Sequence, residues 1–418
     1  MTTWTTPAEP TDPEGSGQHR DRARRRDDRI ARITWSLIAE PADSIALLAR
    51  NELGAAGALT LAREGTETEL LARLGGDLPT DVAEPGSGTH RLRARRALAR
   101  WRARLHGLDI DAVLDDADRR RIRVLTPDDQ EWPVLLDDLQ ETSPHCLWIH
   151  GPGRLDELAA GRTAAIVGSR ASTPYGEDAA ASFGADFAAR GGTVVSGGAY
   201  GIDAAAHRGA LAADGGATIG VLAGGLDRLY PRGNTELLER IRERHLLLSE
   251  APPGTAPTRW RFLARNRLIA ALSQIVVVVE ASWRSGALST ARLADQLSRP
   301  VGAVPGPITS AASAGCHRLI RERGAVMITE SSDLLDLLPG GPAAAEGSFA
   351  VQDELDLLSP ADRRVLDAVP PRSRLGIEQI AREIGFEPLE VESALARLAL
   401  LGLVERAGER FRRARPDR

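Results

Sequence analysis

The sequence predicts an α/β protein with a doubly wound, mostly parallel sheet, and two observations support this fold class. Short runs rich in β-branched residues alternate with segments of helical periodicity through the middle of the 418-residue chain. These runs are continuously apolar, as expected for parallel strands whose two faces are both covered by helices. A chain of this length also has room for two or three domains, each with its own core.

The chain before the predicted sheet divides into a tail and a helical module. Residues 1–29 are rich in Thr, Pro, Asp and Arg without an apolar period, so we expect a disordered tail. Residues 30–115 are predicted to form a helical module, because apolar residues recur at helical spacing from 30 to 74. The basic segment 91–107 carries seven arginines and no acid. It is either a helix that contacts DNA or a solvated helix whose counter-charges lie in the acidic segment after it.

Residues 116–340 are predicted to contain the sheet. The expected strands are 121–126 (RIRVLT), 164–168 (AAIVG), 193–197 (TVVSG), 217–223 (ATIGVLA), 246–250 (LLLSE), 275–281 (IVVVVEA), 301–306 (VGAVPG) and 325–329 (AVMIT). The segments between most of them are long enough for the crossover helices that parallel strands need.

The C-terminal part is predicted to be a separate domain. Residues 341–352 have the Pro, Gly and Ala composition of a linker. Residues 353–418 show three helical segments followed by a short hairpin, which predicts a winged helix.

Composition excludes several classes of function. The chain has no lysine among its 53 basic residues, which excludes a Walker-type phosphate loop and leaves arginine and backbone amides to bind phosphate. The net charge of −5 argues against a protein that coats nucleic acid by bulk charge. Cys146 and Cys316 have no C-x-x-C spacing, and we see no signal peptide, membrane span, metal pattern or catalytic triad. We therefore expect a cytoplasmic protein without a metal, a cofactor or catalytic residues.

The candidate site lies beyond the carboxyl ends of the strands, where open α/β sheets bind ligands. Glycine-containing turns there can present backbone amides to an anion, although each could also be an ordinary tight turn. The candidates are Ser169 and Arg170 after strand 164–168, Gly197, Gly198 and Gly201 after strand 193–197, and Ser285 and Gly286 after strand 275–281.

A cluster of arginines precedes the valine-rich strand 275–281. Residues 259–267 (RWRFLARNR) contain four arginines, and no acid occurs between Glu250 and Glu280. We place Arg265 at a helix N-terminus, where a cation opposes the helix dipole and therefore indicates a function. Asn266 and Arg267 lie beside it. Phe262 or the nearby Trp260 offers a stacking face to a base, or packs under the sheet.

Five segments resemble, in order and spacing, the DNA-processing protein A (DprA/Smf) family. They are AIVGSR, SGGAYGIDAAAHRGAL, VLAGGLDRLYPRGN, the stretch from SEAPPG to SGALSTARLA, and VPGPITSAASAGCHRLIRERGA, and together they cover about residues 120–335. The resemblance implies an extended Rossmann-like domain that binds single-stranded DNA, with a helical N-terminal module of SAM or helix-hairpin-helix type and a winged helix. It also implies protection of incoming DNA during natural transformation, loading of the RecA recombinase, and a homodimer. The DNA contacts that it implies are Ser169, Arg170, Gly197, Gly198, Gly201, Phe262, Arg265, Asn266 and Arg267.

Two other functions remain open. Phosphoribohydrolases that resemble lysine decarboxylases share the fold, but their P-G-G-x-G-T-x-x-E motif is replaced here by SGALSTA. A sequence-specific regulator would use the winged helix, but its third helix carries Glu387, Glu390 and Glu392 against Arg397 alone, which repels phosphate.

Overall fold

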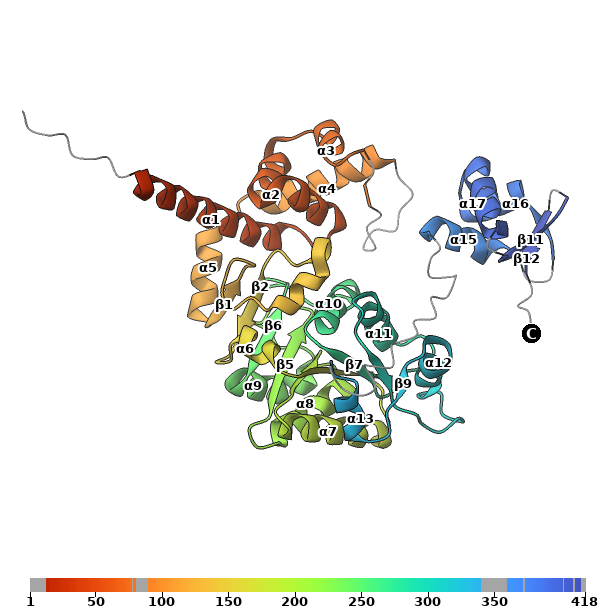
Figure 1. The fold of residues 1–418 in the computed structure, drawn as a ribbon. Helices are drawn as coiled ribbons and strands as arrows, with labels where there is room; N and C mark the ends of the chain where they lie inside the picture. The colour runs from red at the N-terminus through yellow and green to blue at the C-terminus, as the bar shows by residue number, and fades with distance from the viewer. Residues whose placement is uncertain are drawn as a thin grey trace, which may run out of the picture. The chain divides into compact units, whose positions relative to one another are not determined.

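The computed structural model describes residues 13–76, 78–79, 89–339, 359–370, 373–400, 402–408 and 410–414. The chain forms two compact units, Met1–Ser348 and Phe349–Arg418. The first contains helices packed on a large sheet, which confirms the predicted α/β class (Figure 1).

A nine-stranded sheet forms the centre of the described part of the first unit. Its strands are β1 (Ile122–Leu125), β2 (Leu147–His150), β3 (Thr163–Val167), β4 (Thr193–Ser196), β5 (Ala217–Leu222), β6 (Leu246–Ser249), β7 (Ile275–Val278), β8 (Val301–Ala303) and β9 (Val326–Met327). Their spatial order is β1-β2-β6-β5-β4-β3-β7-β8-β9. From β6 to β9 every pairing is parallel, whereas β2 is antiparallel to both β1 and β6. The mostly parallel sheet was therefore predicted correctly.

The order β5-β4-β3-β7-β8-β9 is that of a Rossmann fold. The chain starts this part at β3, adds β4 and β5 on one side, and then returns to add β7, β8 and β9 on the other. The strand order thus reverses between β3 and β7, and ligands of such sheets bind beyond the carboxyl ends of the strands at this switch point.

Helices cover both faces of the sheet. Along β3, Ala165 and Val167 pack into the apolar core beneath α10 and α11, whereas Ala164 and Ile166 pack into the core beneath α7 and α8. This alternation explains why the strand is apolar at every position. The helices of this part are α6 (Leu155–Ala160), α7 (Pro174–Ala189), α8 (Ile202–Ala212), α9 (Thr235–Arg244), α10 (Arg259–Ala271), α11 (Gly286–Gln296), α12 (Ala314–Arg323) and α13 (Ser331–Asp336), with 3₁₀ helices η1 (Val134–Thr142) and η2 (Arg232–Asn234).

Strand β2 was not predicted from the sequence. Its four residues contain a single β-branched side chain, Ile149, and show no alternation of polar and apolar positions. The strand is held by its two neighbours, since Trp148 pairs with Val124 of β1 and Ser249 of β6. Tertiary pairing, which a short local pattern does not reveal, determines this strand.

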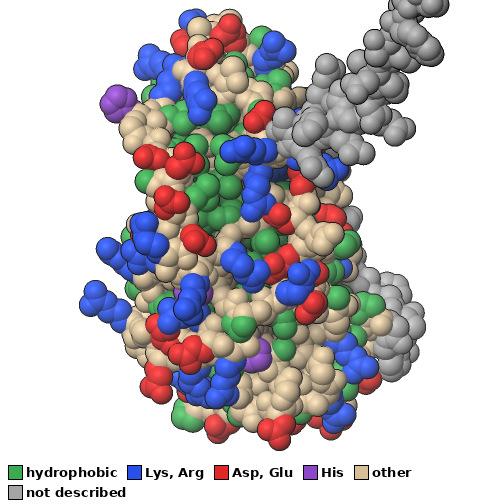
Figure 2. All heavy atoms as spheres, turned by 90° about the vertical axis from the view of Figure 1, so that its left-hand side faces the viewer, with side chains coloured by type: hydrophobic (Ala, Val, Ile, Leu, Met, Phe, Trp, Pro, Cys, Tyr) green, Lys and Arg blue, Asp and Glu red, His purple; other side chains and the backbone are tan. Residues whose placement is uncertain are grey.

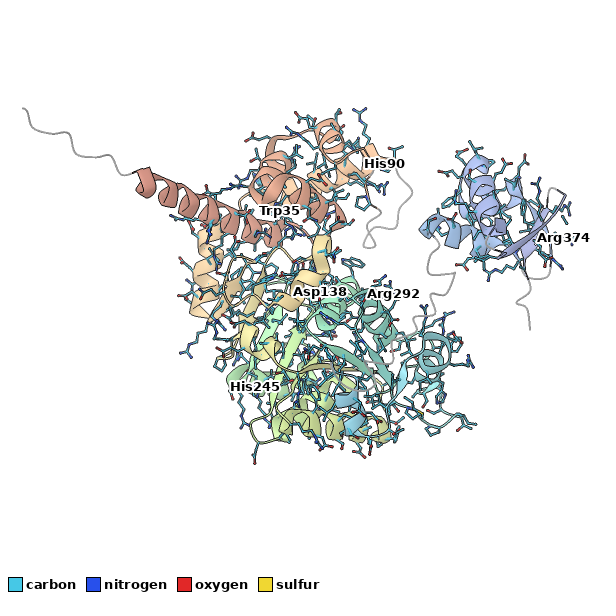
Figure 3. The ribbon with its side chains drawn as sticks, viewed as in Figure 1. Trp35, His90, Asp138, His245, Arg292 and Arg374 are labelled. Atoms are coloured by element: carbon cyan, nitrogen blue, oxygen red, sulfur yellow. The ribbon has the colours of Figure 1, made fainter. Side chains whose placement is uncertain are left out.

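The helical module packs around two tryptophans. The Trp35 and Trp101 rings meet edge to face with centroids 5.0 Å apart, and Trp35 Nε1 donates a hydrogen bond to the Ala55 carbonyl. Trp35 lies among the helices of this module (Figure 3). The buried Asp43 carboxylate accepts hydrogen bonds from Ala46 N at 3.0 Å and from Trp101 Nε1 at 3.1 Å. Its helices are α1 (Pro13–Ile38), α2 (Ser44–Glu64), α3 (Glu67–Arg73) and α4 (His90–Leu105), and α5 (Ile110–Arg119) leads into the sheet.

The expectation of a disordered tail over residues 1–29 is wrong for residues 13–29, which form the first turns of α1. Arg32 pairs with Asp28 one turn earlier at 2.6 Å. Arg29 pairs with Asp129 and donates to the Val124 carbonyl of β1 at 2.7 Å. The helix is therefore fixed to the sheet by contacts distant in sequence. Residues 1–12 lie outside the described residues.

Three arginines of α4 pair with acids outside the acidic segment that follows. Arg91, Arg100 and Arg104 pair with Glu67, Asp43 and Glu40, all of which precede the helix in sequence. Within the later segment, Asp116 pairs with the neighbouring Arg119 and Arg120 of its own helix end. The solvated-helix interpretation was thus wrong about the partners.

The described part of the second unit has three helices and a small antiparallel sheet. Its elements are α15 (Pro360–Ala368), β10 (Leu375–Gly376), α16 (Ile377–Ile384), α17 (Pro388–Leu400), β11 (Val404–Ala407) and β12 (Arg410–Arg413). The helices and the β11–β12 hairpin occur in the predicted order, and the sheet order is β10-β12-β11. The winged-helix assignment itself stays a prediction. Residues 341–352, predicted as a linker, lie outside the described residues.

Candidate nucleic-acid interface

A pocket of about 750 Å³ opens at the switch point of the sheet. It is lined by the turn after β3, the N-terminal ends of α8 and α11, and one side of α10. Seven of the predicted site residues line it. They are Ser169, Arg170, Phe262, Arg265, Asn266, Ser285 and Gly286.

Helix α10 carries the innermost cation of the pocket. The helix begins at Arg259, after Thr258, whose hydroxyl accepts a hydrogen bond from Arg261 N. Arg265 therefore lies in the middle of the helix, and its placement at a helix N-terminus was wrong. A threonine N-cap marks the true start of this helix.

The Arg265 guanidinium is largely buried and yet open to the pocket. The residue as a whole is 6% exposed, Nη1 donates to the Val221 carbonyl, and Nε has no hydrogen-bond partner among the described residues. Burial lowers the pKa of Arg265 to about 10, with Asp203 raising it and Arg170 lowering it further. Arg265 therefore remains charged at neutral pH and brings a desolvated positive charge to the pocket.

An arginine and two aromatic rings stand together at the pocket wall. The Arg170 guanidinium lies 4.4 Å from the centre of the Phe262 ring, and the centres of the Phe262 and Tyr230 rings are 6.0 Å apart. Arg170 is exposed, and no carboxylate of the described residues pairs with it. A cation with free donors beside an aromatic face can bind a phosphate and stack a base at adjacent positions.

The predicted glycines of the turn after β4 (Gly197, Gly198 and Gly201) shape the pocket but do not line it. The amides of Gly197 and Ala199 point to the buried Asp203 carboxylate, at 3.2 and 3.4 Å, and not to an external anion. Burial raises the pKa of Asp203. A Cβ atom on Gly197 would lie 1.9 Å from Arg265 Nη1, so the missing side chain leaves room for the guanidinium.

Gly198 and Gly201 serve the turn itself. Their φ angles are 65° and 75°, in the region that favours glycine. A Cβ atom on Gly201 would also lie 2.4 Å from the carbonyl oxygen of Ser169. These glycines thus allow the turns after β3 and β4 to approach each other at the base of the pocket.

Two arginines of the cluster are paired, so the interpretation of an unpaired cationic cluster was wrong for them. Arg267 Nη2 contacts Glu250 Oε1 at 2.8 Å, with side chains 7% and 6% exposed. Arg261 binds Glu40 of the helical module. Neither arginine lines the pocket. Neither partner lies between Glu250 and Glu280, because one is Glu250 itself and the other, Glu40, is distant in sequence.

The start of α11 forms the opposite wall. The Ser285 hydroxyl caps the helix by accepting a hydrogen bond from Ala287 N at 3.3 Å. Asn266 Nδ2 of α10 contacts the Gly286 carbonyl at 3.4 Å. The predicted residues of the two helices are therefore brought together.

Three functional candidates were missed from the sequence. Arg259 and Arg284 are exposed residues of the pocket lining and have no ion pair among the described residues. Asp203 is the one acid among the described residues of the lining. Arg259 lies in the arginine cluster 259–267, and Arg284 directly precedes Ser285. The orientation of each depends on where α10 begins and on the turn before α11, which the sequence pattern does not show. In the part of the chain that the structure describes, the lining thus contains four arginines (Arg170, Arg259, Arg265 and Arg284) and one buried acid.

Other groups with possible chemistry have structural roles. The Glu280 carboxylate accepts hydrogen bonds from Thr173 N and Oγ1 at 2.9 and 2.7 Å, at the start of α7. His207 Nδ1 lies 2.7 Å from Thr218 Oγ1 in the core, and His317 Nε2 lies 2.9 Å from the Gly306 carbonyl oxygen. Trp260 is half-buried and is not part of the lining.

The positive charge of the pocket is local. On the face shown in Figure 2, arginine side chains are interspersed with acidic ones, in keeping with the net charge of −5. The described residues contain no group of three or more His, Cys, Asp or Glu side chains able to hold a metal ion. Across those same residues, no helix is long and apolar enough to cross a membrane.

Comparisons with known proteins agree with the geometry. Residues 123–339 match the family described as DNA recombination-mediator protein A. A Mycobacterium tuberculosis H37Rv protein given the name DNA processing protein DprA is 47% identical over 317 residues, covering 73% of this chain and 81% of its own. Protein Smf of Synechocystis sp. PCC 6803 is 32% identical over 332 residues, covering 72% of this chain and 82% of its own.

Among solved structures, the X-ray structure of DprA from Streptococcus pneumoniae covers 75% of this chain and 98% of its own, with a TM-score of 0.56 and 30% identity. The sequence resemblance, the strand order and these matches lead to one conclusion: the chain belongs to the DprA/Smf family of DNA recombination-mediator proteins.

Proposed function

We propose that this protein binds single-stranded DNA in the arginine-lined pocket at the switch point of its sheet. The observation that carries the proposal is the convergence of four arginines around Phe262, with Asp203 as the only acid among the described residues of the lining. The arginines are Arg170, Arg259, Arg265 and Arg284. Phosphates are bound by arginine forks, and bases stack on aromatic rings. A double helix hides its bases, so this combination favours a single strand.

The roles of the lining residues follow from their burial. Arg170, Arg259 and Arg284 are exposed at the rim and can neutralise successive phosphates. Arg265 at the base of the pocket is desolvated. A phosphate that reaches it accepts a charge-assisted hydrogen bond in place of the water that burial has removed. Ser169 and Ser285 add hydroxyl groups, and Phe262 stacks a base. These contacts carry little sequence information, which suits a protein that must accept any strand.

We further propose the cellular role that the family suggests. The protein protects incoming single strands during natural transformation and loads the RecA recombinase onto them as a homodimer. These roles need a site that holds a strand without cleaving it, and the pocket has no acid–base pair for cleavage among the residues that line it.

In the C-terminal unit, Arg397 of α17 is paired with Asp362 at 2.6 Å, which leaves that helix without a free cation to bind phosphate.

The phosphoribohydrolase alternative is the less favoured function. Such an enzyme needs a carboxylate aimed at the sugar, and Glu280 is instead bound to Thr173 outside the pocket. Purified protein should therefore release no base from nucleoside monophosphates. Turnover that disappears in Glu280→Gln would establish the enzyme and refute our proposal.

The proposal is tested by binding labelled single- and double-stranded oligonucleotides of the same sequence at two salt concentrations. We expect preference for the single strand and an affinity that falls steeply with salt, since each neutralised phosphate of a single strand adds about 0.7 to the slope of log affinity against log salt. Equal affinity for the two forms, or no binding of single strands, would contradict the proposal.

A further inference from the structure

Helix α10 connects the pocket to the helical module. On one side of the helix, Phe262, Arg265 and Asn266 line the pocket. The residue before Phe262 is Arg261, and it turns away to the helical module, which lies on the side of the core where α10 is found (Figure 1). A contact at Arg261 therefore acts on the same first turn that carries the stacking ring.

The contact is a two-pronged ion pair with Glu40, in the loop between α1 and α2. Arg261 Nε lies 2.8 Å from Glu40 Oε2, and Arg261 Nη2 lies 3.0 Å from Glu40 Oε1. The two side chains are 15% and 18% exposed. Paired forks with little solvent are stronger and more directional than surface ion pairs.

Glu40 also binds the end of α4, and its partner Arg261 binds the segment before α10. Arg104, in the last turn of α4, donates to Glu40 Oε1 and to the Ile38 carbonyl. Arg261 Nη1 donates to the Ala256 carbonyl, directly before Pro257 and Thr258 of the pocket lining. Burial opposes ionisation of Glu40, but the hydrogen bonds from Arg261 and Arg104 outweigh it and hold its pKa below the usual value. One carboxylate thus links the helical module to both the start of α10 and the segment that leads into it.

We propose that Glu40 is a positioning residue of the DNA site, through which the helical module sets the start of α10 and hence Phe262. The inference rests on the proposed function. The module then contributes to DNA binding without touching DNA. Arg29, which joins the module to Asp129 near β1, provides a comparison, because this second contact does not involve α10.

The direction of the change in DNA affinity in Glu40→Ala separates this role from a simple electrostatic effect. Removing a carboxylate makes the protein less negative, so a purely electrostatic effect in Glu40→Ala would strengthen DNA binding. Positioning predicts weaker binding, by about fivefold or more, as for typical couplings between sites. The salt slope should not change, because Glu40 contacts no phosphate. Arg261→Ala should add little to the loss in Glu40→Ala, because the two residues act through one contact.

The experiment measures single-strand affinity of the full chain for wild type, Glu40→Ala and the control Arg29→Ala, below the unfolding temperature of each. Glu40→Gln, which keeps the volume and one acceptor, decides by the same criterion if Glu40→Ala does not fold. Weaker binding in the Glu40 variant with unchanged binding in Arg29→Ala supports the inference. Binding as tight as wild type, or an equal loss in Arg29→Ala, overturns it. Failure of wild type itself to prefer single strands would instead refute the proposed function.

Discussion

A variant of Arg267 tests whether some arginines of the 259–267 cluster stabilise the fold while others contact DNA. Replacing Arg267 with alanine removes the partner of Glu250 from a pair whose side chains are 7% and 6% exposed. The remaining carboxylate is then buried without compensation, which costs about 3–5 kcal/mol of folding free energy. Arg267 does not line the pocket, so the salt slope of DNA binding should stay at the wild-type value.

The assay combines urea unfolding with titration of a labelled single strand at several salt concentrations. The double variant Arg267→Met/Glu250→Leu is the matched control, because replacing both members of a buried pair with apolar residues is often neutral. It should recover most of the lost stability. If Arg267→Ala kept its stability within about 1 kcal/mol and reduced the slope by about 0.7, Arg267 would be a phosphate contact and our assignment would be wrong.

Two further predictions concern the glycine turn and the core histidine. Gly197→Ala should weaken single-strand binding and lower the free energy of unfolding by about 1–3 kcal/mol, because its Cβ atom would displace the Arg265 guanidinium. The control in the same unfolding and binding assays is Gly161→Ala, where an added Cβ atom meets no atom within 4 Å. Burial lowers the pKa of His207 to about 3, so the unfolded chain binds a proton that the folded chain does not as the pH falls below about 6.5. Stability should therefore fall between about pH 6.5 and pH 3, by up to about 1.4 kcal/mol per pH unit from this residue, and His207→Leu should flatten that dependence in urea unfolding at pH 7 and 5. An unchanged dependence in His207→Leu, with the exposed-residue variant His106→Gln as reference, would show that another group is responsible.

The sheet could be predicted from the sequence because its parallel strands are buried on both faces. Runs such as residues 275–278 are apolar throughout, and this local pattern is enough to identify them. Strand β2 and the first turns of α1 could not be predicted in this way. Both are stabilised by partners distant in sequence, as in the contact of Arg29 with the Val124 carbonyl.

The candidate site was predictable in position but not in its charge pairing. The switch-point rule located Ser169, Arg170 and Ser285 at one edge of the sheet, and the structure brings them to one pocket. Arg261, in contrast, binds Glu40, 221 positions away in the chain. No pattern within the 259–267 segment distinguishes this paired arginine from Arg265, since burial and partner choice are decided by the tertiary fold.

The most direct test of the account is the salt dependence of single-strand binding in Arg170→Ala/Arg284→Ala. Both side chains are exposed in or beside the pocket and have no ion pair among the described residues, so stability should stay within about 0.5 kcal/mol of wild type. The control Arg190→Ala/Arg208→Ala removes the same charge from exposed positions, directly after α7 and on α8. We predict that the slope of log affinity against log salt is smaller by about 1.4 in the pocket variant and unchanged in the control. An unchanged slope in the pocket variant, or an equal decrease in both, would contradict the assignment of this pocket as the DNA site.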